Sequence, residues 1–266
     1  MSLLERGGKL RKIYVYCVLF LLFLPMFILV FFSFNESKLN VIFTGFTFDW
    51  YAKLFGNPDL LDAFKNTMLI AVLSTTISTV LGVLGAVGLK KFNVRGKAFI
   101  DKLIYIPIVI PEIVLGIALL SVFTLARLEL GFWTVLLAHI SFSVPFVITS
   151  VRSTLYALPK HVESAAADLG ASRWQIFWHI TLPLIRPGIV SGALLAFTLS
   201  LDDVVISYFA AGPGTNTLPL YIYSNIKTGI SPDVNALTTL MLIFTIIILT
   251  LSAHFQSQKL AERSAK

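Results

Sequence analysis

The segment Leu158–Gly188, LPKHVESAAADLGASRWQIFWHITLPLIRPG, lies between two long apolar runs. Residues 162–169 are rich in alanine and predict a short helix, and Gly170 supplies the left-handed position at which such a helix ends. Ser172 and Gln175 have the spacing of a capping box, which predicts the start of a second short helix. The pattern indicates two short helices around a glycine turn, presented to a partner protein outside a membrane. An ordinary loop with helical content is the alternative.

The composition is that of a membrane protein. Of 266 residues, 56% are hydrophobic and 13% charged, and the mean hydropathy is +0.84. These values exclude an ordinary soluble domain. The net charge of +7 would suit a nucleic-acid partner, but the basic residues cluster at the ends of apolar runs. Because that placement is typical of membrane orientation, we expect a lipid bilayer and no nucleic acid.

Six apolar runs are long enough to cross a bilayer, which takes about 20 residues. They are expected at residues 13–34, 67–89, 103–123, 132–151, 189–209 and 234–253. Pro107 and Pro111 interrupt the third run. The second run contains small residues that let helices pack closely, namely Gly82, Gly85, Ala86 and Gly88. We therefore predict an all-α integral membrane protein with six transmembrane helices and one domain, residues 1–266.

The basic residues also predict the orientation. Sixteen of the 21 lie on the side that holds both termini and the loops at 90–102 and 152–187, and five lie on the other side. The positive-inside rule places the richer side in the cytoplasm. Both termini and the loop 152–187 are therefore predicted to be cytoplasmic.

The chain carries no pattern for catalysis or for binding a nucleotide. G-x-x-x-x-G-K-[ST], H-E-x-x-H and G-x-S-x-G do not occur. The single cysteine, Cys17, forms no internal disulfide. The four histidines lack metal-ligand spacing; they are His139, His161, His179 and His254. We expect no catalytic residue, metal site or cofactor in this chain, and a partner must bind ATP and Mg²⁺ if transport is energised.

Three acidic residues lie inside apolar runs, namely Glu112, Asp202 and Asp203. An ionised carboxylate costs several kcal/mol at membrane depth, so each should face protein or a wet cavity. No lysine or arginine lies in the runs to neutralise them, which predicts a corridor that favours cations. Neighbouring helical residues point about 100° apart, so at most one of the two aspartates points straight into a pore. Protonated or backbone-paired structural acids are the alternative.

Aromatic residues near the predicted outer face are expected to form an interfacial belt. They are Trp50, Tyr51, Trp133, Tyr208, Tyr221 and Tyr223. A few of them can instead stack on a cationic ligand. Trp50 is the stronger candidate because Asp49 precedes it.

Residues 164–172, SAAADLGAS, and the ITLP at 180–183 resemble the EAA loop of ABC-importer permeases. Ser164 replaces the glutamate of that pattern, and Glu163 lies one place earlier. The resemblance implies the type I importer permease fold, with a cytoplasmic ATPase dimer that receives the short helix in a groove. The residues assigned to ATPase coupling are Glu163, Ser164, Ala165, Ala166, Leu169, Gly170, Leu182 and Pro183.

Further segments narrow the resemblance to the C-type permease subunit of spermidine/putrescine importers. They are FDWY at 48–51, PEIV at 111–114, LSLDDVV at 199–205 and SPDVNA at 231–236. This family implies a multi-pass subunit of the bacterial inner membrane, paired with a second permease as a heterodimer and supplied by an extracytoplasmic binding protein. The substrate-pathway candidates are Trp50, Glu112, Ser200, Asp202 and Asp203, with Tyr223 added from the outer aromatics.

Two alternatives to polyamine import stay open. The first keeps the importer and changes the cargo to another cation, such as a metal ion, which the acids equally suit. The second is a self-contained secondary carrier, which six runs without a visible inverted repeat disfavour. A scaffold protein has no use for three acids in apolar runs.

Overall fold

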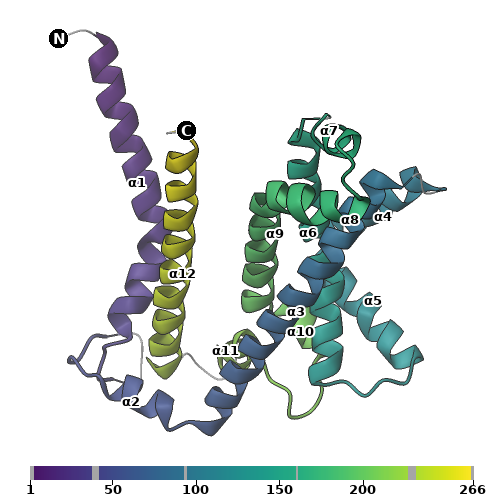
Figure 1. The fold of residues 1–266 in the computed structure, drawn as a ribbon. Helices are drawn as coiled ribbons and strands as arrows, with labels where there is room; N and C mark the ends of the chain where they lie inside the picture. Colours follow the sequence, from purple (N-terminus) through teal and green to yellow (C-terminus); the bar gives the residue numbers. More distant parts are fainter. Residues whose placement is uncertain (1–2, 38–41, 93–94, 160, 227–231, 265–266) are drawn as a thin grey trace. The chain divides into compact units, whose positions relative to one another are not determined.

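The structure, a computed structural model, describes residues 3–37, 42–92, 95–159, 161–226 and 232–264 (Figure 1). Lys160 of the predicted cytoplasmic loop, and residues 1–2 and 265–266 at the termini, lie outside these ranges. Every regular element in the described residues is helical, apart from one isolated bridge between Asn35 and Phe46. The all-α prediction is confirmed.

The helices follow one another without long connections in most of the chain. They are α1 (Leu3–Phe32), α2 (Asp49–Phe55), α3 (Pro58–Lys91), α4 (Lys97–Val109), α5 (Glu112–Leu125), α6 (Phe132–Ala157), α7 (Val162–Asp168), α8 (Arg173–Ile176), the π-helix η1 (Phe177–Thr181), α9 (Leu182–Asp202), α10 (Val205–Ala210), α11 (Leu218–Ile226) and α12 (Pro232–Ser264). Their contacts form two units, residues 1–61 with 224–266 and residues 62–223. The single domain 1–266 stays a prediction.

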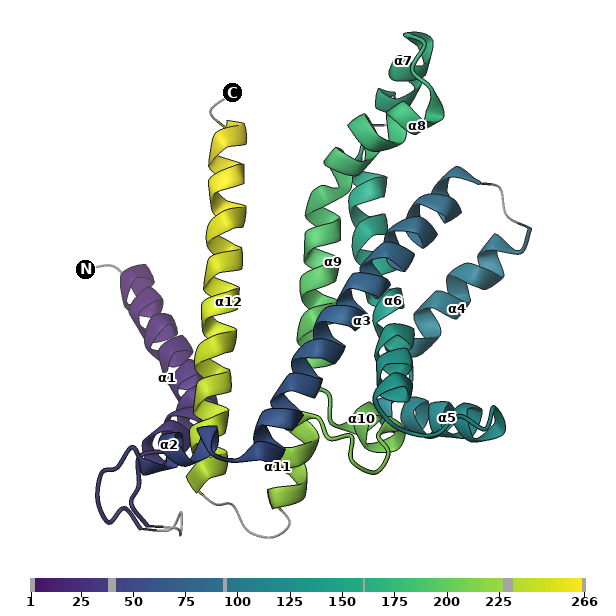
Figure 2. The same cartoon turned by 60° about the horizontal axis from the view of Figure 1, so that its bottom comes forward.

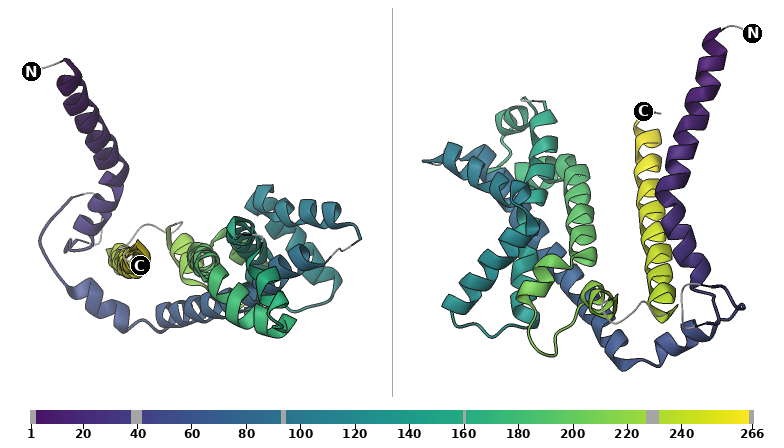
Figure 3. Two further views of the ribbon diagram at one scale, coloured as in Figure 1. Left: turned by 45° about the horizontal axis from the view of Figure 1, so that its top comes forward. Right: turned by 180° about the vertical axis from the view of Figure 1, so that it is seen from behind.

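The first unit contains α1, α2 and α12. α12 packs against both α1 and α2, and Figure 3 shows α1 and α12 side by side. Residues Arg11–Phe32 of α1 are long and apolar enough to cross a membrane, and none of this stretch is buried within the chain. Its exposed side chains, such as Phe20 and Leu21, therefore suit contact with lipid or with another protein.

The second unit is built around α3, α6 and α9, which pack together in Figure 2. Their shared core contains buried aliphatic side chains, namely Val83, Ala86 and Val87 of α3, Val147, Ile148, Val151 and Leu155 of α6, and Ile185 and Ala196 of α9. A Cβ atom on Gly82 would lie 2.5 Å from Val147 Cγ1, and one on Gly85 would lie 3.3 Å from Ile148 Cδ1. The predicted role in close helix packing is confirmed for Gly82 and Gly85, and Ala86 is buried in the same core. For Gly88 it was wrong, because a Cβ atom there would have no neighbour within 4 Å.

The predicted third span, 103–123, is not one straight helix. α4 ends at Val109 and α5 begins at Glu112, and the two are bent by 111°. Pro111 lies in the break, and Ile110 before it is extended, with φ −68° and ψ 135°. Contact with the proline ring disfavours the helical conformation of the residue that precedes it. Pro111 therefore favours a break in the helix here. The prediction that Pro107 also interrupts the run was wrong, because Pro107 lies inside α4.

The predicted fifth span, 189–209, is also divided. α9 ends at Asp202, Asp203 is extended with φ −65° and ψ 125°, and α10 starts at Val205. The described part of the sixth run is apolar over Pro232–Ile247, shorter than the predicted 234–253. Four helices, and five if the bent pair counts as one, are long enough to span a membrane in the described residues, so the six-helix count is approximate.

The segment that follows α6 forms the two short helices that were predicted. Gly170 adopts the left-handed conformation with φ +84°, between α7 and α8. Ser172 caps α8, with Gln175 N donating to Ser172 Oγ and Ser172 N donating to Gln175 Oε1. α8 then continues through η1 into α9. Figure 2 shows α7 and α8 at the opposite end of the unit from α10.

Candidate functional site

A cleft of about 340 Å³ lies in the second unit where α4, α5, α6, α9 and α10 meet. Both helix breaks open onto it. Its lining residues are Pro107, Ile108, Ile110, Glu112, Leu115, Phe142, Phe146, Leu199, Asp202, Asp203, Val204, Val205 and Ile206. The side chains that line it are thus apolar except for three carboxylates.

The three acids that the sequence singled out come together in this cleft. Glu112 is the first residue of α5 and is exposed. Asp202 is the last residue of α9 and is also exposed, whereas Asp203 beside it is only 9% exposed. No lysine, arginine or histidine is among the lining residues. Their assignment to a substrate pathway stays a prediction.

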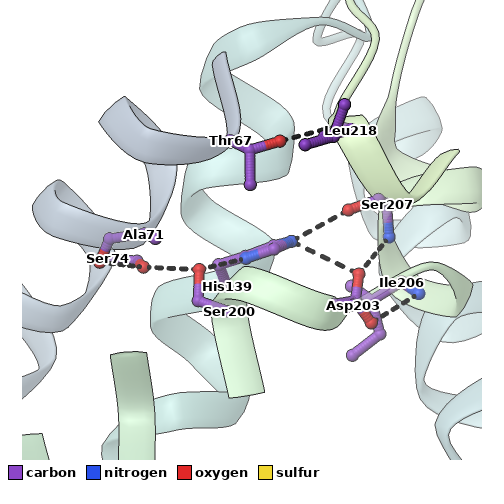
Figure 4. Close-up of polar contacts among 9 residues, drawn as sticks. All are labelled: Thr67, Ala71, Ser74, His139, Ser200, Asp203, Ile206, Ser207 and Leu218. Atoms are coloured by element: carbon purple, nitrogen blue, oxygen red, sulfur yellow. Dashed lines mark hydrogen bonds and ion pairs between the residues drawn. The ribbon is translucent and has the colours of Figure 1, made fainter. Parts of the chain in front are cut away.

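Asp203 is held by the protein itself (Figure 4). Its Oδ1 accepts a hydrogen bond from Ile206 N at 3.2 Å, and its Oδ2 accepts one from Ser207 N at 2.7 Å. His139 Nε2 lies 3.4 Å from the same Oδ2. Asp203 therefore caps the N-terminus of α10, where the free backbone N–H groups favour a negative charge. Asp203 therefore fits the alternative of a backbone-paired structural acid.

His139 extends this contact into a buried network that joins four helices. The side chain is 1% exposed, and its Nδ1 lies 2.7 Å from Ser200 Oγ. Its Nε2 lies 3.1 Å from Ser207 Oγ, and Ser200 Oγ lies 3.0 Å from Ser74 Oγ. Figure 4 shows the chain of contacts from Ser74 on α3, through Ser200 on α9 and His139 on α6, to α10.

Two predicted pathway residues of this unit do not line the cleft. Ser200 is 3% exposed and belongs to the buried network just described. Tyr223, on α11, has its ring 6.5 Å from that of Tyr208. The start of α11 is fixed to α3 by the hydrogen bond from Leu218 N to Thr67 Oγ1, at 2.7 Å.

Trp50 lies in the first unit and is 8% exposed. Its Nε1 donates a hydrogen bond to Asn35 O at 2.7 Å, and Lys53 Nζ lies 4.4 Å from the ring centroid. Asn35 also holds the loop that follows it in sequence. Thr44 N donates a hydrogen bond to Asn35 Oδ1, and Asn35 Nδ2 donates one to Ile42 O. A cation of the chain itself therefore occupies one face of the ring.

The predicted coupling residues lie on α7, on the turn after it and at the start of α9. Leu169 is 89% exposed beside Gly170, and Ser164, Ala165 and Pro183 are exposed as well. Ala166 is partly buried, and Leu182 packs against the core of α3, α6 and α9. An open depression lies here, lined by Leu169, Gly170, Ala171, Gln175, His179 and Ile180. The segment offers an exposed tip on a fixed base.

The side chain of Glu163 fixes this segment to the rest of the second unit. Its Oε1 accepts a hydrogen bond from Thr181 Oγ1 at 2.7 Å, and Lys91 Nζ lies 3.4 Å from the same oxygen. Ser164, which occupies the glutamate position of the EAA pattern, donates to His161 O at 3.1 Å within its own helix. The carboxylate thus joins α7 to η1 and to the end of α3.

Comparison with known proteins follows this geometry. The family model described as the binding-protein-dependent transport system inner membrane component matches residues 78–265. The chain belongs to this family. Its alignment with the spermidine/putrescine transport system permease protein PotC of Escherichia coli strain K12 is 42% identical over 249 residues, covering 94% of this chain and 92% of that protein.

Two further relatives and one solved structure are also similar to this chain. The PotC protein of Haemophilus influenzae is 40% identical over 91% of this chain and 95% of its own length. The putrescine transport system permease protein PotI of E. coli K12 is 40% identical over 83% of this chain and 81% of its own length. The crystal structure of a bacterial ABC transporter involved in alginate import matches with a TM-score of 0.75 at 17% identity, over 96% of this chain and 98% of that chain. That likeness confirms the type I importer permease fold.

His139 is the residue of this inner membrane component that sequence reasoning missed. It was treated as one of four scattered histidines, although it is the one that lies inside an apolar run with Pro145. A titratable side chain in such a run needs a buried partner, just as the acids do. By this argument, His139 is expected to contact one of the acids in the apolar runs.

Proposed function

We propose that this chain is the transmembrane permease subunit of an ATP-driven importer of polyamines in the bacterial inner membrane. The observation that carries the proposal is the cleft in which Glu112, Asp202 and Asp203 line apolar walls without a basic side chain. The relatives named for spermidine and putrescine transport support the same cargo. Aliphatic polyamines carry ammonium groups on a methylene chain, so carboxylates and apolar walls suit the two parts of the molecule.

The proposal includes three partners that the chain needs. A second permease forms the other half of the pathway as a heterodimer, and an extracytoplasmic binding protein delivers the cation. A cytoplasmic ATPase dimer binds ATP and Mg²⁺ and contacts the segment 152–187. Both termini of this chain lie on the same cytoplasmic side of the membrane as that segment. The exposed tip at Leu169 and Gly170, on a base fixed by Glu163, supports this coupling role.

Uptake by the reconstituted importer tests the cargo. Vesicles containing both permeases and the ATPase, with binding protein outside and ATP inside, should accumulate labelled spermidine or putrescine and stop when ATP is omitted. Unlabelled spermidine should compete, whereas Mg²⁺ or Mn²⁺ at the same concentration should not. ATP-dependent uptake of a labelled metal ion, without ATP-dependent uptake of labelled spermidine or putrescine, would exclude this cargo. Uphill uptake by this chain alone without nucleotide would exclude the importer and favour a secondary carrier.

A metal cargo has less support from the structure than a polyamine. In the described residues no group of three or more histidine, cysteine, aspartate or glutamate side chains is arranged to hold a metal ion. The three acids of the cleft are spread over the ends of two helices and a break, which suits an extended cation better than a compact one.

A further inference from the structure

Asp202 and Asp203 are adjacent in sequence, but their carboxylates are used differently. Asp203 has both oxygens bound, with backbone N–H donors at 3.2 and 2.7 Å and His139 Nε2 at 3.4 Å. Asp202 is exposed in the cleft, and no other side chain of the described residues is hydrogen-bonded to it. Glu112, at the start of α5, is open in the same way. Three contacts use most of the roughly four acceptor sites of the Asp203 carboxylate, whereas those of Asp202 and Glu112 are more open to a ligand.

His139 is placed to maintain this difference. Both of its ring nitrogens have partners, one at Ser200 on α9 and the other at Ser207 and Asp203 beside α10. The ring therefore joins the end of α9 to the start of α10, across the break that contains Asp203. With Asp203 turned into the protein at this break, Asp202 before it faces the cleft.

We propose that His139 is a positioning residue that holds Asp203 in the break between α9 and α10, so that Asp202 and Glu112 are the carboxylates that bind the cation. The identity of the cation rests on the proposed function, whereas the contact between His139 and Asp203 does not. Two open carboxylates suit a cargo with at least two ammonium groups. Asp203 serves the site by fixing its shape.

Single variants in the complete importer separate the two roles. Asp202→Asn should raise the spermidine concentration for half-maximal uptake about tenfold or more, since hydrogen bonds to charged groups are the stronger ones. The melting temperature of the purified complex should stay as in wild type. Asp203→Asn places an amide nitrogen against backbone N–H donors, so it should lower the melting temperature by roughly 2–4 °C or more and reduce maximal uptake. The half-saturating concentration should change little.

A double-mutant cycle on melting temperature tests the pairing directly. Asp203→Asn and His139→Gln remove the same contact, so the double variant should lose less than the sum of the two single losses. Ser164→Ala with His139→Gln serves as the control cycle and should be additive, because Ser164 on α7 shares no partner with His139. Additive losses for Asp203 and His139 would overturn the proposal.

Further outcomes keep the test decisive. Ser207→Ala removes one partner of His139 Nε2 while the Ser207 N–H that binds Asp203 remains. It should lower the melting temperature and leave the half-saturating concentration unchanged, even if the Asp203 variant does not assemble. A tenfold weaker half-saturation in Asp203→Asn at an unchanged melting temperature would make Asp203 a ligand and refute the division. If the wild-type importer transports no polyamine, the melting-temperature cycles still report on His139 and Asp203, so the two failures are distinguishable.

Discussion

At the scale of single residues, Trp50 illustrates how burial changes a functional interpretation. An exposed tryptophan near an acid suggests stacking on a cation, but this ring is 8% exposed and donates its N–H to Asn35 O at 2.7 Å. Asn35 in turn binds the backbone at Ile42 and Thr44. The contacts favour Trp50 as the residue that fixes the loop after α1.

The variant Trp50→Phe keeps an aromatic face and removes the N–H donor. The buried carbonyl of Asn35 then loses a partner, which costs about 1–3 kcal/mol. We expect a lower melting temperature of the purified complex and an unchanged half-saturating spermidine concentration. Trp133→Phe is the matched control, because Trp133 is 71% exposed, and it should leave both values unchanged. A weaker half-saturation in Trp50→Phe without loss of stability would indicate stacking on the cargo.

Residue-level prediction succeeded where the signal was local. Gly170 and the Ser172–Gln175 box were read from spacing of a few residues, and the structure has the glycine at φ +84° and the box closed. The pairing of His139 with Asp203 joins positions 64 residues apart in the numbering, and nothing local indicates it. Charge alone placed both aspartates in a pathway, while backbone hydrogen bonds at a helix start decide which of them is open.

At the scale of elements, the breaks are the features that hydropathy did not resolve. An apolar run reports that a segment lies in the membrane, and it does not report whether the helix continues. Pro111 predicted an interruption, yet the 111° turn between α4 and α5 depends on how α5 packs against α10. Gly116 permits that packing, since a Cβ atom there would lie 2.6 Å from Phe209 Cδ2.

The segment α7–η1 allows a test of how Glu163 fixes the coupling tip. Glu163→Ala removes the hydrogen bond from Thr181 and the ion pair with Lys91, so α7 loses its link to η1 and α3. We expect several-fold less spermidine taken up per ATP hydrolysed by the reconstituted importer. Glu163→Gln keeps an acceptor for Thr181 and loses only a partly exposed ion pair, worth about 0–1 kcal/mol, so it should stay close to wild type.

The control for this pair of variants is Ser164→Ala. Ser164 is exposed and its hydroxyl bonds only to His161 O within the same helix, so the ratio of uptake to hydrolysis should not change. If Ser164→Ala uncouples the importer and Glu163→Ala does not, Ser164 has kept the role of the EAA glutamate.

Gly170 gives a second test at the coupling tip. Gly170→Asp adds a side chain where no atom of the chain lies within 4 Å, so any clash must come from the partner. We expect ATP hydrolysis to continue while uptake falls. Gly96→Asp is the matched control, because Gly96 also has a positive φ, +80°, and open space around it. It carries the same backbone strain outside the coupling segment and should stay coupled. Equal uncoupling in both variants would assign the effect to strain.

At the scale of the whole molecule, the distribution of charge decides which partner meets which face. Sixteen of the 21 basic residues lie on the side assigned to the cytoplasm, and the acids of the cleft lie within the apolar runs. In the proposed importer, the same chain attracts a cation into its interior and keeps its basic loops on one side of the bilayer. In this proposal the ATPase acts from that side, because the segment 152–187 is predicted to lie there.

Cysteine labelling tests this orientation, and the chain suits it because Cys17 is the single cysteine. In a Cys17→Ser background, Leu169→Cys and Phe55→Cys place thiols at sites that are 89% and 71% exposed. A membrane-impermeant maleimide added to intact spheroplasts should label Phe55→Cys, which lies on the predicted outer side. Leu169→Cys should react only after the membrane is permeabilised, in cells that lack the ATPase so that the tip is not covered. Labelling of Leu169→Cys in intact spheroplasts, with Phe55→Cys protected, would invert the topology and separate the coupling segment from any cytoplasmic ATPase.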